Sequence, residues 1–430
     1  MKIAIAGYGL EGESSYNYWA NQGHDMTIVD EKQPSRDLPP EAQALIGEGV
    51  FEQLDGFDMV IRTAGLAPRK IKSSGKVWSA TNEFFATCEA QIIGVTGSKG
   101  KGTTASLIAS MLEAAGKKVW LVGNIGVAGL DVLADIQKDD IVVYELSSFQ
   151  LWDIESSPHV GVVLFIEQEH LDVHASMDEY VAAKARITLF QDENDTLIFN
   201  KTNHYAAQIA SSSRAFKTGY PDDNTAHVKN GNFYYGEHII CSVGVLQIQG
   251  AHNQENACAA IDAVWGYTKD IRAIEAGLRA FVGLPHRLQL VKEVDGISYY
   301  DDSIATTPSS AIAALRAFDV PKVIILGGSS KGSDFTELGV ELTRHDVQVL
   351  LIGDEAPAIA GACRAAGFVD YEIMTYVTMQ NVVERARNIA KPGGVVLLSP
   401  ASASFGLFKN YADRGEQFSA AVSGLDSKDS

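Results

Sequence analysis

Residues 91–104 read QIIGVTGSKGKGTT and predict a strand that runs into a glycine-rich loop and then a helix. The apolar run QIIGVTG is typical of a buried strand, and a helical pattern continues to Ala115. Glycines let backbone N–H groups approach an anion closely, and a helix N-terminus favours negative charge. We therefore predict a phosphate-binding loop, in which Lys101 reaches the outer phosphates and a following hydroxyl is available to Mg²⁺.

The loop matches the shorter pattern GxxGK, because Val95 stands where the longer phosphate-loop pattern has glycine. A glycine- and lysine-rich surface turn is the alternative, but the strand–loop–helix context favours phosphate binding. The candidate phosphate-binding residues are Gly97, Ser98, Lys99, Gly100, Lys101, Gly102, Thr103 and Thr104.

A second glycine-rich turn lies near the N-terminus. Gly7, Gly9 and Gly12 follow the apolar run KIAIAG, and Asp30 ends the next predicted strand, DMTIVD. The spacing GxGxxG resembles the dinucleotide-binding fingerprint. Glycines at a tight strand–helix turn are also common for structural reasons, so on this motif alone a nicotinamide-dependent dehydrogenase stays open.

Strands and helices alternate in three successive cycles, which favours an α/β fold with parallel sheets. We predict three domains: residues 1–89 are Rossmann-like, residues 90–283 form a central P-loop ATPase-like parallel sheet, and residues 284–430 are again Rossmann-like. Within the central domain, residues 225–249 alternate aromatic and polar side chains around Asn230-Gly231, which predicts a hairpin.

Composition excludes several classes of protein. Of the 430 residues, 46% are hydrophobic and 21% are charged, which is typical of a globular chain with a substantial core. No apolar run reaches the length of a membrane-spanning helix. The net charge of −19 disfavours nucleic-acid binding, and the four widely spaced cysteines favour a reducing cytoplasm over a disulfide framework.

Three titratable residues lie near predicted strand ends or on a predicted helix. Glu145 ends the strand DDIVVYEL, where ligands of α/β proteins bind, and it could hold Mg²⁺; a surface carboxylate is the alternative. His170 follows the strand VGVVLF in an acidic setting, where a metal role competes with a structural one. Lys184 lies within a predicted helix, and composition alone favours a solvated side chain.

Considered together, these stretches resemble the Mur ligase family over nearly the whole chain, and within it the branch that adds glutamate to UDP-N-acetylmuramoyl-L-alanine. The motifs that recur in the family's order are GSKGKGTT, ELSSFQ, EHLDVH with AAKARI, AHNQEN, GLPHR, DDSIATTP, GGSSKGSDF and SPASASFGLFKNYADRG. Of these, ELSSFQ and the C-terminal SPASASF are specific to the glutamate-adding branch.

The resemblance implies a role for each matching residue. Lys184 matches a carbamylated lysine, and the implied Mg²⁺ ligands are Thr103, Glu145, His170 and Lys184. The implied catalytic residues are Lys101, Lys184, His170, Asp302 and Arg287. ATP would also contact Asn253 and Asn256. The implied UDP-sugar contacts are Gly9, Leu10, Asp30, Thr63, Gly65 and Asn124. The implied pocket for the incoming amino acid comprises Thr306, Lys331, Ser404, Phe405 and Tyr411.

The sequence departs from the family pattern at several positions. Gly102 follows Lys101 where this branch has a hydroxyl residue, so the Mg²⁺ hydroxyl falls to Thr103, and the GKG loop resembles folylpolyglutamate synthases. Ile304 replaces a lysine, and Glu169 replaces an aspartate. Phe165 stands in place of an asparagine, and Gly406 in place of an aspartate. The string SIATTP also resembles a sub-branch that adds L-glutamate, so both enantiomers stay open, with D-glutamate preferred.

The resemblance implies a cytoplasmic, ATP-dependent ligase that acts on small molecules through an acyl phosphate, and we expect a monomer. Two other functions are considered. A folylpolyglutamate synthase shares the GKG loop but lacks an N-terminal UDP-binding domain, so residues 1–89 argue against it. A nucleotide sensor without catalytic activity is the alternative from another class.

Overall fold

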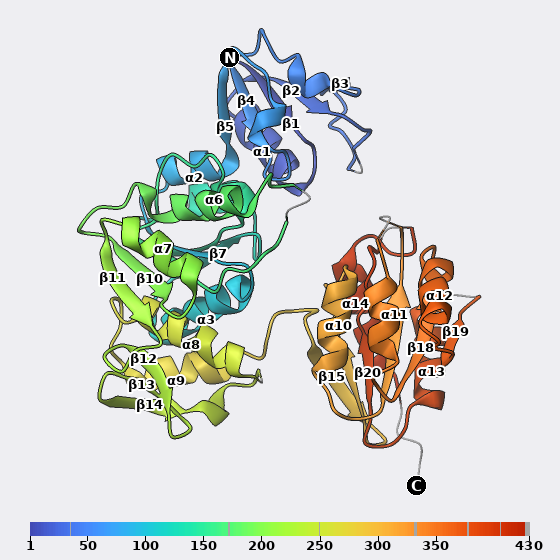
Figure 1. Cartoon of the computed structure of the whole chain (residues 1–430). Helices are drawn as coiled ribbons and strands as arrows, with labels where there is room; N and C mark the ends of the chain where they lie inside the picture. Colours follow the sequence, from blue (N-terminus) through green and yellow to red (C-terminus); the bar gives the residue numbers. More distant parts are fainter. Residues whose placement is uncertain are drawn as a thin grey trace. The chain divides into compact units, whose positions relative to one another are not determined.

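The computed structural model describes residues 1–34, 36–170, 173–248, 250–330, 333–375, 378–404 and 406–425. They separate into two compact units, Met1–Val282 and Gly283–Ser430 (Figure 1). The predicted α/β class with parallel sheets is confirmed in both units. Over these ranges, no helix has both the length and the apolar character needed to cross a membrane.

The first unit begins with a five-stranded parallel sheet of order β3-β2-β1-β4-β5. Successive side chains of β1 point to opposite faces. Ile3 and Ile5 therefore join one apolar cluster, while Ala4 and Ala6 join another. The bounds are β1 Lys2–Ala6, α1 Leu10–Ala20, β2 Asp25–Asp30, β3 Gln43–Ile46, η1 Val50–Glu52, β4 Met59–Arg62, η2 Pro68–Lys70, β5 Lys76–Ser79 and α2 Ala80–Thr87.

A six-stranded parallel sheet follows, of order β11-β10-β9-β6-β8-β7. Strand β6 lies inside this sheet and leads through the glycine-rich loop into α3, as the sequence predicts. The bounds are β6 Gln91–Thr96, α3 Lys101–Ala114, β7 Val119–Gly123, α4 Gly129–Val132, η3 Leu133–Asp135, β8 Ile141–Glu145, α5 Ser148–Leu151, β9 Val160–Val163, α6 Met177–Leu189, β10 Thr196–Asn200, α7 His204–Ser212 and β11 Phe216–Tyr220.

The predicted hairpin at Asn230-Gly231 is present. Both residues have positive φ (49° and 73°), and Lys229 pairs with Asn232 across the turn. Helices α8 and α9 follow and both contact α3 (Figure 1). The bounds are β12 Ala226–Lys229, β13 Asn232–Tyr235, β14 His238–Ser242, η4 Val243–Val245, α8 Ala251–Val264 and α9 Ile271–Ala280.

The second unit contains one six-stranded sheet of order β15-β16-β20-β17-β18-β19. Its strands are parallel except for the edge strand β15, which pairs antiparallel with β16 and was not anticipated from the sequence. Apolar clusters cover both faces. The bounds are β15 Gln289–Val294, β16 Ile297–Asp301, α10 Pro308–Arg316, β17 Lys322–Gly327, α11 Thr336–Leu342, β18 Val347–Ile352, α12 Ala356–Ala365, β19 Tyr371–Ile373, α13 Met379–Ile389, β20 Val395–Leu398 and α14 Tyr411–Ser423.

Helix α3, which carries the loop, packs backbone to backbone against α9 at Gly277. A Cβ atom there would lie 2.4 Å from the Cα of Met111, and Ser110 Oγ donates to the Gly277 carbonyl at 2.8 Å. We expect Gly277→Ala to lower the free energy of unfolding by about 1–3 kcal/mol through overpacking. The loss should appear in thermal unfolding followed by tryptophan fluorescence.

The matched control is Gly361→Ala in α12, where the nearest atom to an added Cβ lies 4.0 Å away. That helical glycine has room for a methyl group, so the change should stabilise its helix by about 0.5–1 kcal/mol. Equal stability of Gly277→Ala and the wild type would contradict the close approach of the two helices.

Candidate active site

The conformation of the glycine-rich loop requires glycine at position 100. Gly100 precedes α3 with φ of 85°, and a Cβ atom there would lie 2.3 Å from Asn256 Oδ1 of α8. Asn256 in turn donates to Asn253 Oδ1 at 3.3 Å. The structure thus brings the two asparagines expected around the adenine next to the predicted phosphate loop.

Ser98 and Lys99 of the loop contact the segment that follows β9. Ser98 donates from its backbone N–H to the carbonyl of Phe165 at 2.9 Å, and its hydroxyl donates to the Glu167 carbonyl at 2.9 Å. The same hydroxyl lies 2.9 Å from the hydroxyl of Tyr180 on α6. Lys99 is exposed and forms an ion pair with Glu167 at 2.5 Å. Ser98 therefore anchors the loop, and Lys99 contacts a carboxylate at the surface.

Two lysines meet at one backbone carbonyl. The Gly97 oxygen accepts hydrogen bonds from Lys101 Nζ at 3.2 Å and from Lys184 Nζ at 2.7 Å. Lys184 is buried on α6, so it is not the solvated lysine that composition favours. Burial, and then the neighbouring charge of Lys101, hold the pKa of Lys184 well below its ordinary value.

Glu145 is buried, which excludes the alternative of a surface carboxylate. It ends β8 opposite Val95 of β6, the strand that leads into the loop. The side-chain amide of Asn124 donates to Glu145 Oε1 at 3.5 Å. The predicted substrate contact Asn124 and the predicted metal ligand Glu145 are therefore neighbours at the carboxyl ends of β7 and β8.

His170 is exposed with φ of 55°, and its ring meets that of Phe149 edge-on at 4.9 Å. His174, four residues later in the same motif, is not among the predicted site residues. Its ring is buried, stacks on Phe149 at 5.3 Å, and lies 3.0 Å from Ser148 Oγ through Nε2. The sequence did contain a signal for this residue, because the motif EHLDVH has a second histidine at position 174. Residues 171–172 of this motif lie outside the described part.

The glycine turn of the first sheet is held by Asp30 and Thr63. Asp30 Oδ2 accepts from the Tyr8 N–H at 2.9 Å, and Thr63 Oγ1 donates to the Ala6 carbonyl at 2.8 Å. A Cβ atom on Gly7 would lie 2.3 Å from Thr63 Oγ1. The other predicted UDP-sugar residues of this domain are the exposed Gly9, Leu10 and Gly65, which follow the carboxyl ends of the paired strands β1 and β4.

In the second unit, Asp302 follows β16 and is buried. Its carboxylate accepts from Ser399 Oγ at 2.6 Å and from the Leu288 N–H at 3.1 Å. Burial raises the pKa of Asp302 to about 7, against the opposing influence of these hydrogen bonds and of Arg287. Arg287 itself is exposed.

The predicted amino-acid pocket draws on neighbouring strands. Strand β20 pairs with both β16 and β17, so the loops after the three strands begin at the same sheet edge. Thr306 is half-buried, Ser404 is buried, and Tyr411 is exposed at the start of α14. The predicted Lys331 and Phe405 lie outside the described residues.

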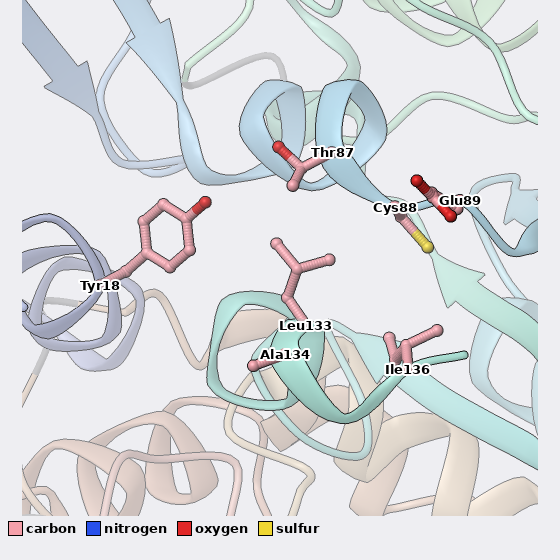
Figure 2. A pocket seen from close by; sticks show the side chains of 7 residues that line it. All are labelled: Tyr18, Thr87, Cys88, Glu89, Leu133, Ala134 and Ile136. Carbon is pink, nitrogen blue, oxygen red and sulfur yellow. The ribbon is translucent and has the colours of Figure 1, made fainter. Parts of the chain in front are cut away.

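A pocket of about 360 Å³ lies elsewhere in the first unit (Figure 2). It is lined by Tyr18, Thr87, Cys88, Glu89, Leu133, Ala134 and Ile136. These residues come from α1, the end of α2, and η3 with the residue after it. No predicted site residue is among them, so this pocket is separate from the predicted chemistry.

The sequence patterns of two known domains match this chain. The Mur ligase middle domain matches residues 95–264, and the Mur ligase, glutamate ligase domain matches residues 286–402. The chain is 35% identical to the UDP-N-acetylmuramoylalanine--D-glutamate ligase of Clostridium tetani, over 99% of this chain and 97% of that protein.

Two solved structures have a similar fold. The UDP-N-acetylmuramate-alanine ligase of Thermotoga maritima aligns with a TM-score of 0.59 at 15% identity, covering 98% of this chain and 99% of that one. The folylpolyglutamate synthase of Mycobacterium tuberculosis, solved with ADP and AMPPCP, aligns with a TM-score of 0.58 at 14% identity, covering 81% of this chain and 95% of that one.

The raised pKa of Asp302 predicts a pH dependence of stability. The ordinary pKa of an aspartate is about 3.9, so between that value and about 7 the folded protein keeps a proton that the unfolded chain releases. The resulting stabilisation is complete below pH 4 and is lost as the pH rises through 7. In wild type, this group should remove about 2–3 kcal/mol of unfolding free energy between pH 5 and pH 8.

Asp302→Asn cannot titrate, so its unfolding free energy should fall less over the same interval. Urea unfolding followed by circular dichroism at both pH values measures the difference. An identical pH dependence of wild type and variant would show that Asp302 has an ordinary pKa in the folded protein.

Proposed function

The chain belongs to the Mur ligase family, and we propose that it joins glutamate to the alanyl carboxyl group of UDP-N-acetylmuramoyl-L-alanine, with cleavage of ATP, in peptidoglycan precursor synthesis. The observation that carries this function is the identity to a D-glutamate ligase over almost the whole of both chains. Phosphate release that requires both the UDP-sugar and glutamate tests it.

The reaction proceeds in two steps. An oxygen of the alanyl carboxylate attacks the γ-phosphorus of ATP, so ADP leaves and an acyl phosphate forms. The amine of glutamate then attacks the acyl carbon, and phosphate leaves as the amide bond forms. Lys101 in the loop and Arg287 carry the positive charge that would neutralise the transferring phosphoryl group.

We assign Mg²⁺ to the carboxyl ends of β6 and β8. In the described residues no three His, Cys, Asp or Glu side chains form a metal cluster, but a phosphate-bound Mg²⁺ needs only one or two protein oxygens. The buried Glu145 and the hydroxyl of Thr103, in the first turn of α3, fit that need. The ion would neutralise charge on the phosphates.

Lys184 and His170 are the proposed ligands of a second Mg²⁺. The low pKa of Lys184 favours the neutral amine, which is the form that adds to CO₂. The nitrogen–carbon bond forms as the amine loses a proton, and the product is a carbamate anion with two oxygens. Those oxygens are the ligand type that Mg²⁺ prefers, which an amine nitrogen does not offer.

The three domains divide the substrates among them in this proposal. Residues 1–89 bind the UDP moiety, residues 90–283 bind ATP and contribute Asn124 to the UDP-sugar, and residues 284–430 bind glutamate. All substrates are small molecules, and we propose a cytoplasmic monomer. A folylpolyglutamate synthase is the second candidate, because the GKG loop of this chain resembles that of those enzymes. The solved synthase covers 81% of this chain, whereas the UDP-N-acetylmuramate-alanine ligase covers 98%.

Lys101→Ala should reduce kcat more than tenfold, because it removes a cation directed at the phosphates. A tenfold loss corresponds to about 1.4 kcal/mol of transition-state stabilisation. Lys118→Ala is the control and should keep wild-type turnover, because this exposed lysine pairs with the buried Asp140 and has no predicted role in the site. A Lys101→Ala enzyme with more than about a tenth of wild-type kcat would remove Lys101 from the mechanism.

Lys184→Ala should be inactive and should regain part of its turnover in formate or acetate, which supply a carboxylate in place of the carbamate. Lys101→Ala offers the matched control, since an added anion cannot replace a missing cation. Initial rates of phosphate release with increasing formate measure the rescue. An absence of rescue at Lys184→Ala, or equal rescue of both variants, would contradict the carbamate.

D-Glutamate should be the incoming amino acid, because the whole-chain similarity is to D-glutamate ligases. The SIATTP string keeps the L-enantiomer under test. Separate assays with each enantiomer measure amide formation. Exclusive use of L-glutamate would refute the D-specific assignment, and use of neither would refute the glutamate assignment.

A further inference from the structure

Arg62 ends β4 and is fully buried. Its guanidinium forms a two-pronged ion pair with Asp153, from Nε to Oδ2 and from Nη2 to Oδ1, both at 2.6 Å. The remaining N–H groups donate to backbone carbonyls at 2.9–3.3 Å, and the acceptors are Thr63, Ala64, Leu66 and Phe149. Every donor direction of this side chain is therefore used.

Three of these acceptors belong to residues 63–66, the loop that carries the predicted UDP-sugar residues Thr63 and Gly65. The other side of the loop is fixed by Glu11, whose Oε2 accepts from the Ala64 N–H at 3.0 Å. Gly65 itself is exposed. The loop is thus held against Glu11 of α1 and against Arg62, with its tip open to solvent.

The remaining partners of Arg62 belong to the segment that follows Glu145. Helix α5 begins after Ser147, whose side chain and Gln150 form a capping box. Phe149 lies on this helix, and Asp153 follows it. Just before it, Leu146 donates to the Val95 carbonyl at 2.9 Å and accepts from Thr96 Oγ1 at 2.8 Å. A short run of residues therefore joins Arg62 to the strand that leads into the phosphate loop.

We propose that Arg62 is a positioning residue that sets the substrate loop 63–66 in register with the phosphate loop, through Asp153 and α5. This inference rests on the proposed function. The planar guanidinium can grip a carboxylate with two bonds and still serve carbonyls on both segments, which a lysine ammonium cannot do. An error of about 1 Å in the bound UDP-sugar would place its carboxylate out of line with the γ-phosphorus.

The test uses Arg62→Lys and Asp153→Asn in the full chain. Both keep the volume of the side chain and remove the two-pronged pair; Asp153 has a side chain that is 24% exposed and should tolerate the change. Because the displaced loop 63–66 would bind the UDP-sugar less well, we expect the KM for UDP-N-acetylmuramoyl-L-alanine to rise about tenfold or more in each variant. Misalignment of its carboxylate should also lower kcat. The KM for ATP should stay within about twofold of the wild-type value, because neither substitution changes a residue of the phosphate loop.

Arg186→Lys is the matched control. This arginine donates to the carbonyl of Ile154 at 3.0 and 2.6 Å, next to Asp153, and in the described structure it makes no hydrogen bond to residues 63–66. The KM of the Arg186→Lys enzyme for the UDP-sugar should equal that of the wild type. Calorimetric titration of each variant with UDP-N-acetylmuramoyl-L-alanine, without ATP, gives a second measure of the same loss.

The outcomes separate the inference from the proposed function. A wild-type enzyme that neither binds nor uses the UDP-sugar would refute the function itself. An active wild type with unchanged UDP-sugar affinity in folded Asp153→Asn would overturn the positioning role, as would a parallel rise of all three KM values. If Arg62→Lys does not fold, the selective UDP-sugar effect in Asp153→Asn decides the matter.

Discussion

The carbonyl oxygen of Gly97 accepts from two lysines, and the chemistry of the first unit depends on how this crowding is relieved. Two ammonium groups near one carbonyl repel each other, and burial adds a desolvation cost to whichever is enclosed. Lys184 is the enclosed one, so the pKa of Lys184 is the one that falls. Carbamylation would replace this repulsion by attraction between an anion and Lys101, which gives the proposed modification a physical reason in the fold.

The local parts of this arrangement could be predicted from the sequence, but the long-range parts could not. The strand–loop–helix pattern and the Asn230-Gly231 turn are determined by residues adjacent in the chain. The burial of Lys184 depends on how α6 packs. One signal existed, because Lys184 lies four residues after Tyr180 and three before Ile187, both of which are buried. A lysine on the apolar stripe of a helix indicates a buried amine. Composition takes no account of this position and therefore favoured a solvated lysine.

The second unit shows the same division. The apolar runs of β16, β17 and β20 were recognised from the sequence. Strand β20 pairs with the other two, so Thr306 and Ser404, which are predicted to bind the incoming amino acid, follow neighbouring strands. The edge strand β15 was missed because most of its residues are only partly buried or exposed, so its apolar signal is weak. Asp302 could be placed at a strand end from the sequence, but its raised pKa could not be foreseen. That shift comes from burial, which depends on how the rest of the second unit packs around the strand end, and it outweighs the hydrogen bonds from Leu288 and Ser399 that lower the pKa.

Arg62 and Arg414 are the two largest fully buried side chains among those described. Each supplies hydrogen-bond donors to buried loop carbonyls, one in each unit. Each arginine donates to several carbonyl oxygens of loops that follow parallel strands, and a buried carbonyl oxygen needs a donor. Arg414 donates to the carbonyls of Ser303, Ser402 and Ala403 and to Ser303 Oγ, which in turn donates to the Tyr411 carbonyl.

The two arginines differ in their compensation for burial. Arg62 has the carboxylate of Asp153 in direct contact, whereas the hydrogen-bond partners of Arg414 are neutral oxygens, and burial lowers the pKa of Arg414 to about 10. A guanidinium stays charged even after such a shift, while a lysine with the same loss would approach neutrality near physiological pH. Arginine is therefore the side chain that can organise these loops from within, and the residues predicted to bind substrate lie on loops that are fixed from their buried side.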